Sequence, residues 1–383
     1  MNFLHLIHSM RPEIGGPPQG VRRITDGYAE LGHAAEIVSL DPEPPVIPGL
    51  RTPLHALGVP GLGKYGRSPR LRPWLRENAP RFDAFVVHGL WQYHGYAALK
   101  ELAGKYRYAV FTHGMLDPWF NRTSRLKQIK KLPYWLAVER PLLRRAERVL
   151  FTSITEANLA LQSFPFSKWT PEVVPYGTPG PPDNVTAQLQ AFQQTVPSVA
   201  GRPFLLYLSR IHPKKGCDIL LEAYADVSRD TELPLLVMAG PDSAGFQSKL
   251  QALASGLGVA DKVIWPGMIT GDAKWGAFRA AEAFILPSHQ ENFGIAVAEA
   301  ASCGTPVLTS SEVNIHGEIS ASNAGFVAPD TREGTAALLR QWAALDANER
   351  QAMSTNAIQC WRSHFNSAGT ARAIADIFTR PRS

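Results

Sequence analysis

Cysteine is scarce in this chain, and long apolar runs are missing. Three cysteines occur among 383 residues, at positions 217, 303 and 360, and no two of them form a Cys-x-x-Cys pair. This spacing predicts neither a disulfide framework nor a zinc site, and it favours a reducing compartment. No run of about 18 uninterrupted apolar residues occurs, so we predict no transmembrane helix.

The first residues and the overall charge exclude further classes. Met1–His8 has neither the basic flank nor the long apolar core of a signal peptide, so we expect a buried strand and a cytoplasmic protein. The chain has 39 Lys and Arg against 33 Asp and Glu, a net charge of +6 that suits anionic ligands or an anionic membrane surface. With 45% hydrophobic residues it is neither disordered nor fibrous.

Short apolar runs alternate with helical stretches, which predicts parallel sheets covered by helices on both faces. The first series of expected strands is Phe3–His8, Ala35–Leu40, Ala84–His88, Ala109–Thr112, Arg148–Thr152 and Pro171–Pro175. The second series is Pro203–Ser209, Leu235–Ala239, Lys262–Trp265, Ala283–Leu286, Pro306–Thr309 and Gly325–Val327. We therefore predict an α/β protein of two doubly wound domains facing each other across a cleft, with ligands beyond the carboxyl ends of the strands.

The region between the two series is rich in proline and glutamine, which is typical of a linker with a short helix. We place an N-terminal domain at residues 1–177, a linker at 178–202 and a C-terminal domain at 203–365. Helical spacing then continues through Ala336–Trp342, Ala357–Phe365 and Thr370–Phe378.

The loop after the first strand contains Gly15 and Gly16. Glycines in such a loop let backbone N–H groups approach a phosphate at a helix N-terminus, although a tight Gly/Pro turn gives the same pattern. Pro17 and Pro18 would stiffen the loop and remove two amide donors. The loop is neither G-x-G-x-x-G nor a P-loop, and this disfavours an NAD-dependent enzyme.

Two loops of the second domain concentrate charge. Arg210 and Lys215 follow its first strand, where two cations could hold a diphosphate, or form a solvated basic loop. Glu291 is expected in the loop after Ala283–Leu286, with Glu299 inside a helix that starts near Gly294. Glu299 lies within an apolar run, where an unpaired charge is costly, so two ordinary surface glutamates are the weaker interpretation.

Two His-Gly pairs end strands of the first domain, at His88 and His113. Either histidine could be a polar group of the cleft or a satisfied core residue. Trp91, Trp119 and Phe120, close by in the sequence, could form a wall for an acceptor or belong to the core.

Positive charge gathers in two segments of the first domain. Lys64–Arg81 has six Lys and Arg, and Arg122–Arg148 has nine, interleaved with apolar residues. Basic residues beside exposed apolar ones favour an anionic membrane surface, and a solvated helix face is the alternative. No nucleic-acid reading module accompanies them.

Taken together, these motifs resemble the retaining glycosyltransferases of family 4 (glycosyl transferases group 1), which have the GT-B fold. The resemblance rests on GGPPQG at 15–20, His113-Gly114, SRIHPKKG at 209–216, AGPD at 239–242, VIWPGMI at 263–269 and ENFGIAVAEAASCGTPV at 291–307. It implies two Rossmann-like domains, a last helix at about 366–383 that returns to the first domain, and a nucleotide-diphosphate sugar donor such as a UDP- or GDP-sugar. It implies no cofactor and no required metal.

The resemblance also implies roles for single residues. Arg210 and Lys215 would bind the donor diphosphate, Glu291 would contact the donor sugar and Glu299 the ribose, while His113 would position the sugar. The other donor-binding residues would be Gly15, Gly16, Gly240, Gly267 and Met268 beside the base, Asn292, Phe293, Gly294 and Ile295. We expect His113, Arg210, Lys215 and Glu291 to carry catalysis.

These expectations describe a retaining hexosyltransferase (EC 2.4 class). Its acceptor would be a lipid-linked saccharide or another oligosaccharide, in bacterial exopolysaccharide or lipopolysaccharide biosynthesis. The enzyme would be peripheral on the inner face of the plasma membrane, without a nucleic-acid partner. A non-catalytic sugar-nucleotide binding subunit and a GT-B nucleotide-sugar epimerase are the alternatives.

Overall fold

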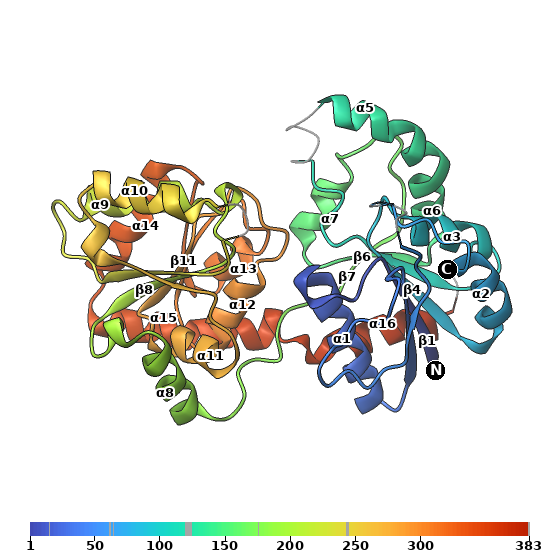
Figure 1. Cartoon of the computed structure of the whole chain (residues 1–383), viewed down its shortest axis with the longest axis horizontal. Coiled ribbons are helices and arrows are strands. Elements are labelled where there is room, and N and C mark those ends of the chain that lie inside the picture. The colour runs from blue at the N-terminus through green and yellow to red at the C-terminus, as the bar shows by residue number, and fades with distance from the viewer. Residues whose placement is uncertain are drawn as a thin grey trace. The chain divides into compact units, whose positions relative to one another are not determined.

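The computed structural model describes residues 1–14, 16–60, 63, 65–118, 125–174, 176–242 and 245–381, with the backbone alone at 125–128. The chain forms two compact units (Figure 1). Unit 1 comprises Met1–Tyr176 and Ser367–Ser383, and unit 2 comprises Gly177–Asn366. Unit 1 is therefore built from two separate stretches of the chain.

In the described part of unit 1, seven parallel strands form one sheet in the order β3-β2-β1-β4-β5-β6-β7. Their bounds are β1 Asn2–Ile7, β2 Ala34–Ser39, β3 Leu54–Ala56, β4 Ala84–His88, β5 Tyr108–Phe111, β6 Arg148–Phe151 and β7 Pro171–Val173. The six strands predicted for this domain are confirmed within one to two residues at each end. The sequence did not indicate β3, because three half-buried residues at a sheet edge are too few to show a pattern.

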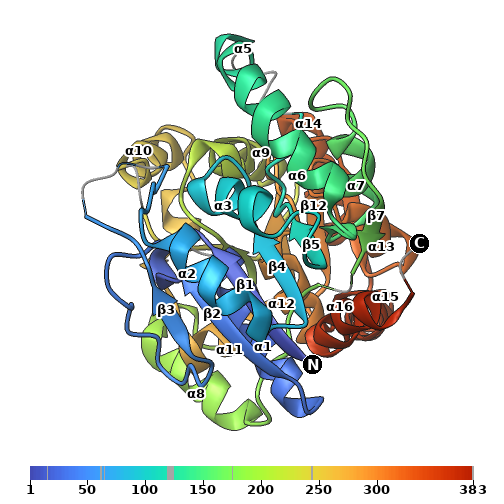
Figure 2. The same cartoon turned by 90° about the vertical axis from the view of Figure 1, so that its right-hand side faces the viewer.

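Helices cover both faces of this sheet. They are α1 Gly16–Glu30, α2 Leu71–Asn78, α3 Tyr93–Glu101, α5 Arg125–Tyr134, α6 Arg140–Arg145, α7 Ile154–Ala160 and α16 Thr370–Thr379, with a π-helical turn at Trp135–Glu139. One apolar cluster joins α2, α3 and α6 to Leu4, Phe85 and Val110. A second joins α1 and α16, which lie side by side (Figures 1 and 2), to Phe3 and Phe111 on the opposite face.

The last helix is fixed to unit 1 by hydrogen bonds as well as by packing. The Arg107 guanidinium donates to the carbonyl oxygens of Phe378 (2.5 Å), Ile377 (3.1 Å) and Arg380 (3.1 Å). These bonds satisfy carbonyls that the end of a helix leaves without partners.

The described part of unit 2 contains a sheet of six parallel strands in the order β10-β9-β8-β11-β12-β13. Its strands are β8 Phe204–Leu208, β9 Leu235–Ala239, β10 Val263–Gly267, β11 Ala283–Leu286, β12 Val307–Ser310 and β13 Gly325–Ala328. Its helices are α8 Val185–Thr195, α9 Cys217–Val227, α10 Gln247–Gly256, α11 Gly271–Ala280, α12 Ile295–Ser302, α13 His316–Ala321, α14 Arg332–Ala344 and α15 Ala347–Cys360. All six strands predicted for this domain are present.

Residues 178–202, which we predicted as a linker, lie within unit 2. Helix α8 packs on α11: Arg279 Nε donates to Gln188 Oε1 (2.8 Å), and a Cβ on Gly276 would meet the Gln188 carbonyl oxygen at 2.0 Å. Phe192 of α8 is buried beside Phe204 of β8. The short helix expected in this region is therefore present, but its buried face makes it part of unit 2 rather than of a linker.

Candidate functional site

Both sheets have a switch point, where the chain leaves one side of the first strand and continues on the other. In unit 1 it lies between β1 and β4, and in unit 2 between β8 and β11. Ligands of doubly wound sheets bind outside the carboxyl ends of the strands at such points. The candidate residues follow these strands or their neighbours, so each unit brings its own set to one sheet edge.

The first loop of unit 2 carries Arg210 and Lys215 from β8 to α9. A short 3₁₀ turn at Pro213–Lys215 leads to Gly216, whose φ is +67°. A Cβ on Gly216 would meet the Pro287 carbonyl oxygen at 2.0 Å, so only glycine fits here. The turn therefore holds the Arg210–Lys215 loop against the loop after β11.

The two cations of this loop differ in environment. Lys215 is buried and forms an ion pair with Glu291. Arg210 is exposed, and it makes no ion pair with any residue that the structure describes. The charge of Lys215 is thus already balanced, whereas that of Arg210 is available to an anionic ligand.

Glu291 and Glu299 stand at different points of one loop and helix, as predicted. The loop after β11 holds Glu291, whose backbone N–H donates to Glu312 and whose carbonyl accepts from Asn314. Helix α12 starts at Ile295, directly after Gly294, whose φ is +74°. A helix of this kind presents free N–H groups at its N-terminus.

Glu299 is buried in α12, and Lys274 of α11 stabilises its charge. Lys274 Nζ lies 2.8 Å from Glu299 Oε1 and 4.4 Å from the centre of the Trp275 ring. Lys274 was not predicted as a site residue, because its pairing depends on how α11 packs against α12.

The remaining unit 2 residues are placed as follows. Gly240 has φ +144°, and a Cβ there would meet the Ser209 carbonyl oxygen at 1.7 Å, so its glycine is required by the protein's own packing. Gly267 (φ +75°) has open space around its Cβ position, and Met268 is 65% exposed. Phe293 is buried against Phe365, with ring centres 5.8 Å apart.

Two further residues of the loop before α12 were predicted to bind the donor. Asn292 Oδ1 is buried with no hydrogen-bond partner among the described residues. Ile295, the first residue of α12, is half-buried.

The first loop of unit 1 differs from the prediction. Gly15 lies outside the described residues, and Gly16 is already the first residue of α1. Pro17 and Pro18 fall in the first helical turn, where their missing N–H groups have no helical partner to lose. A hollow of about 480 Å³ beside them is lined in part by Met10, Pro18 and Gln19.

His113 lies just beyond β5 with a left-handed backbone, φ +49°. Its Nε2 is 3.0 Å from Nδ1 of His88, whose Nε2 is 2.8 Å from Nδ1 of His5. Burial lowers the pKa of His113 and of His5 to about 3, and that of His88 well below the usual value. All three imidazoles are therefore neutral at physiological pH.

A buried carboxylate fixes the turn that carries His113. Glu156 of α7 accepts hydrogen bonds from Thr112 Oγ1 (3.0 Å), the Gly114 N–H (2.8 Å), and the Thr152 N–H and Oγ1 (both 2.7 Å). Burial raises the pKa of Glu156, against the effect of these four donors. The sequence signal was a Ser153-x-x-Glu156 pattern, which predicts only a helix cap.

Trp91 belongs to the core rather than to an open wall. Its ring centre lies 5.1 Å from that of Phe164, its backbone N–H donates to Glu139 Oε1 (2.6 Å), and Lys131 Nζ lies 4.5 Å from its ring centre. Burial raises the pKa of Glu139 to about 8. Trp119 and Phe120 lie outside the described residues.

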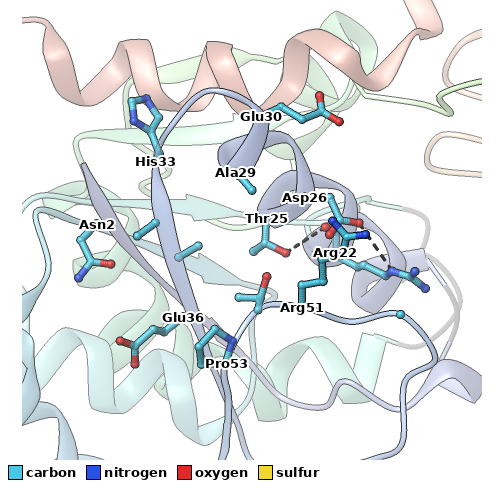
Figure 3. A pocket seen from close by; sticks show the side chains of 14 residues that line it. Asn2, Arg22, Thr25, Asp26, Ala29, Glu30, His33, Glu36, Arg51 and Pro53 are labelled. Carbon is cyan, nitrogen blue, oxygen red and sulfur yellow. Dashed lines mark hydrogen bonds and ion pairs between the residues drawn. The ribbon is translucent and has the colours of Figure 1, made fainter.

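A hollow of about 810 Å³ in unit 1 is unrelated to these groups (Figure 3). It lies beside Asn2 and Ala34, at the amino ends of β1 and β2, opposite the ligand-binding edge. Figure 3 shows Arg22 close to Asp26, an ion pair of 3.7 Å. We assign no site to it.

The described residues also bear on metal binding, on membrane spans and on the first basic segment. Among the described residues, no group of three or more His, Cys, Asp and Glu side chains could hold a metal ion. In the same residues, no helix is both long and apolar enough to cross a bilayer. Three arginines of the first basic segment are paired: Arg72 and Arg76 with Glu101, and Arg81 with Glu36.

The fold and both switch-point sites define a GT-B protein of two Rossmann-like units. The model of the glycosyl transferase 4-like domain matches residues 15–177, and that of glycosyl transferases group 1 matches residues 190–359. The chain therefore belongs to the group 1, family 4 glycosyltransferases, as the sequence motifs predicted.

Relatives and solved structures agree with this family. The chain is 33% identical over 186 residues to a D-inositol 3-phosphate glycosyltransferase 2 of Catenulispora acidiphila, covering 46% of this chain and 43% of the relative. It is 30% identical over 257 residues to the Thermobispora bispora enzyme of similar name, covering 61% and 56%. The matches thus span about half the length of these relatives.

Among solved structures, Anabaena HepE in complex with UDP has a TM-score of 0.79 at 18% identity, covering 99% of this chain and 100% of HepE. Sucrose-phosphate synthase of Thermosynechococcus elongatus has a TM-score of 0.76, also at 18% identity, with 99% and 98% covered. At this identity the likeness concerns the fold.

Proposed function

We propose that this chain is a retaining glycosyltransferase that transfers a hexose from a nucleoside diphosphate sugar to an acceptor. The observation that carries the proposal is the charge arrangement at the unit 2 switch point. Exposed Arg210, the Lys215–Glu291 pair and the N-terminus of α12 converge on the same sheet edge. A diphosphate needs such cations and N–H groups, both to bind and to leave.

The roles follow from the position of each group. Arg210 and Lys215 bind the diphosphate and stabilise the charge that develops as it departs. Glu291 accepts hydrogen bonds from the sugar, and buried Glu299 accepts them from the ribose hydroxyls. These steps involve no metal or cofactor.

Of the five glycines predicted to contact the donor, Gly16 has nothing within 4 Å of a Cβ and no positive φ, so neither packing nor backbone conformation in the described protein explains why it is glycine. Close approach of a ligand would explain it. Gly267 also has open space around a Cβ, but its φ of +75° already favours glycine. Met268 beside Gly267 offers an exposed apolar surface for a nucleobase. Gly15 and Gly240 stay predictions from the resemblance.

On the side of unit 1, we propose His113 as a hydrogen-bonding partner of the donor sugar. A neutral imidazole can donate to a hydroxyl without competing for the leaving diphosphate as a cation would. The titles of the HepE structures name UDP and UDP-glucose as that protein's ligands. This supports a UDP-sugar as the first donor to try.

The donor is tested by thermal stabilisation with UDP-, GDP- and ADP-sugars, because a ligand of the folded state raises its stability. We expect one base to give a shift that Glu299→Gln abolishes. Glu232→Gln is the matched control, since Glu232 is exposed before β9, at the opposite sheet edge. Absence of a shift with all three bases would contradict the proposal and favour a degenerate binding subunit. Retention is read from the anomeric configuration of the product.

We propose a phosphate-bearing, lipid-linked acceptor at an anionic membrane surface, as in exopolysaccharide or lipopolysaccharide assembly. Ile129, Leu136 and Phe166 are 66%, 43% and 72% exposed, next to Lys130 and Arg140 of the second basic segment. Apolar side chains among cations are what binding to an anionic bilayer requires. The name of the curated relatives supports a phosphorylated acceptor, in their case an inositol phosphate.

Sedimentation with phosphatidylglycerol vesicles at low salt tests this surface. We expect binding that falls at least severalfold in the Ile129→Ser, Lys130→Glu double variant. Val46→Ser removes an apolar side chain that is 88% exposed elsewhere in unit 1, and it should bind as the wild type does. Transfer to free inositol 3-phosphate without vesicle binding would replace the lipid-linked acceptor by a soluble one.

A further inference from the structure

Three histidines from neighbouring strands form a continuous row in unit 1. His5 lies in β1, His88 ends β4 and His113 follows β5, and these strands are adjacent in the sheet. Ring centres are 5.1 Å apart for His5 and His88, and 5.2 Å for His88 and His113. His5 and His88 are buried, whereas His113 is half-buried at the sheet edge. We call these residues the histidine row.

The row has only two consistent arrangements of protons when all three rings are neutral. Each contact joins an Nδ1 to an Nε2, at 2.8 and 3.0 Å, and each needs one proton. His88 carries a single proton, so it donates at one contact and accepts at the other. Either every ring carries its proton on Nδ1, or every ring carries it on Nε2.

The two arrangements give His113 opposite properties. With protons on Nδ1, His88 donates to His113 Nε2, and His113 keeps a free Nδ1–H. With protons on Nε2, His113 donates its N–H to His88 Nδ1 and has a bare Nδ1. The proton position on His5 therefore decides whether His113 offers the ligand a donor or an acceptor.

The surroundings of His5 favour the first arrangement. Its Nε2 is buried and has no hydrogen-bond partner among the described residues. A buried N–H group without an acceptor is rarer and costs more free energy than a buried bare nitrogen without a donor. This nitrogen should therefore carry no proton. The ring of Tyr28, whose hydroxyl is also buried, lies 5.6 Å from that of His5.

We propose that the histidine row holds His113 with its proton on Nδ1 and so presents a hydrogen-bond donor to a hydroxyl of the donor sugar. His5 and His88 are then positioning residues that act through His113. The sugar contact rests on the proposed function, while the proton arrangement does not.

Burial keeps the row neutral by lowering the pKa of each ring, and at His88 the neighbouring histidines add to this effect. His94 Nε2 donates to the carbonyl of His88 (2.8 Å), and Glu156 binds the backbone beside His113. Burial lowers the pKa of His94 to about 4, as it does that of the row. No proton transfer from solvent is needed for the row to act.

The proton arrangement is measured by ¹⁵N NMR of protein labelled in its histidine rings, since protonated and bare ring nitrogens have distinct shifts. We expect His113 to show a protonated Nδ1 and a bare Nε2. Its signals are assigned by their loss in His113→Asn. A protonated Nε2 on His113 would overturn the proposal.

Two variants of His5 separate proton control from packing. Asn at position 5 keeps an amide that can donate from the place of Nδ1, whereas the carboxylate of Asp has the same shape and can only accept. We expect His5→Asp to move the His113 proton to Nε2 and His5→Asn to keep the wild-type spectrum. A role in packing alone predicts the same spectrum for both variants. His55→Phe, a histidine of unit 1 outside the row, is the control.

Steady-state kinetics with the nucleotide sugar tests the consequence. Loss of one hydrogen bond to the sugar should raise KM about three- to tenfold in His5→Asp, with a smaller effect in His5→Asn. An altered spectrum with unchanged KM would overturn the sugar contact. A wild-type protein that transfers no sugar but shows the expected spectrum would overturn the proposed function and leave the proton arrangement standing.

Discussion

The candidate sites of the two units differ in the kind of polar group that they offer a ligand. Unit 2 uses charge: Lys215 pairs with Glu291, Lys274 with Glu299, and Arg210 is exposed. Unit 1 uses neutral groups: the histidine row and a turn fixed by Glu156. Cations suit a leaving diphosphate, whereas a neutral donor suits a sugar hydroxyl. This contrast agrees with the roles proposed above, in which unit 2 binds the diphosphate and His113 a hydroxyl of the sugar.

The units also differ in how their sites are encoded. The key residues of unit 2 lie in two short motifs, each within one loop and the helix after it. In unit 1, the groups around His113 come from β1, β4, the loop after β5 and α7. Removing one residue should therefore affect ligand chemistry most in unit 2, and local structure most in unit 1.

The largest effect is expected from Lys215→Met. Losing a preorganised charge at the leaving group should lower kcat about 10²- to 10³-fold, because that charge acts mainly in the transition state. Single-turnover transfer from the nucleotide sugar measures it. Lys214→Met, one residue earlier on the same turn, should stay within a few-fold. A Lys215 variant as active as the Lys214 variant would remove the contrast between the units.

Glu156→Ala tests the structural side of the contrast. It leaves four donors of Thr112, Gly114 and Thr152 without their acceptor, at a cost of about 3 kcal/mol in the free energy of unfolding. Urea unfolding checks the value. Glu172→Ala, at the exposed edge strand β7, should cost less than about 1 kcal/mol. Equal costs for both variants would show that the His113 turn does not depend on Glu156.

The last comparison concerns pH, and its effect is divided among several histidines of unit 1. Folding holds the pKa of His5 at about 3 and of His94 at about 4, below the ordinary 6.5, so the unfolded chain binds protons that the folded chain does not. Stability is then complete above about pH 6.5 and falls as pH drops, by up to about 1.4 kcal/mol per pH unit for each histidine.

Native-state hydrogen exchange of β1 and β4 amides, between pH 7 and 5, follows this loss within unit 1. His5→Phe removes one titrating group, so its stability should fall less steeply by up to that amount. If the stability of the wild type and of His5→Phe changed equally with pH, His5 would not gain a proton on unfolding, and this prediction would be wrong.

The sequence predicted the fold, and it predicted which loops and helix carry Arg210, Lys215, Glu291 and Glu299, because these features are local. Twelve of the strands were predicted from short runs in the sequence, whatever strands lie beside them in the sheet. The loop and helix that carry Glu291 and Glu299 were predicted from their own residues alone. Lys274, Glu156 and the pairing of His5 with His88 were not predictable. Each depends on which strands and helices are neighbours, and a single sequence does not reveal the strand order.

The assignment of residues 178–202 to a linker has a related cause. The proline and glutamine content of this region predicts a linker, whereas the buried residues Phe192 and Gln188 determine that α8 packs on unit 2. Two buried positions in eleven residues are too few to outweigh the polar ones.

Helix α16 determines when unit 1 can be completed during synthesis. Its apolar residues cover Phe3 and Phe111 of the sheet and Ile24 of α1, yet it is translated after unit 2. A ribosome must translate all of unit 2 before this helix emerges, so the apolar face of the first sheet waits uncovered on the nascent chain. Unit 2, which is one continuous stretch, can finish first. Unit 1 can therefore be completed only after unit 2 has been translated.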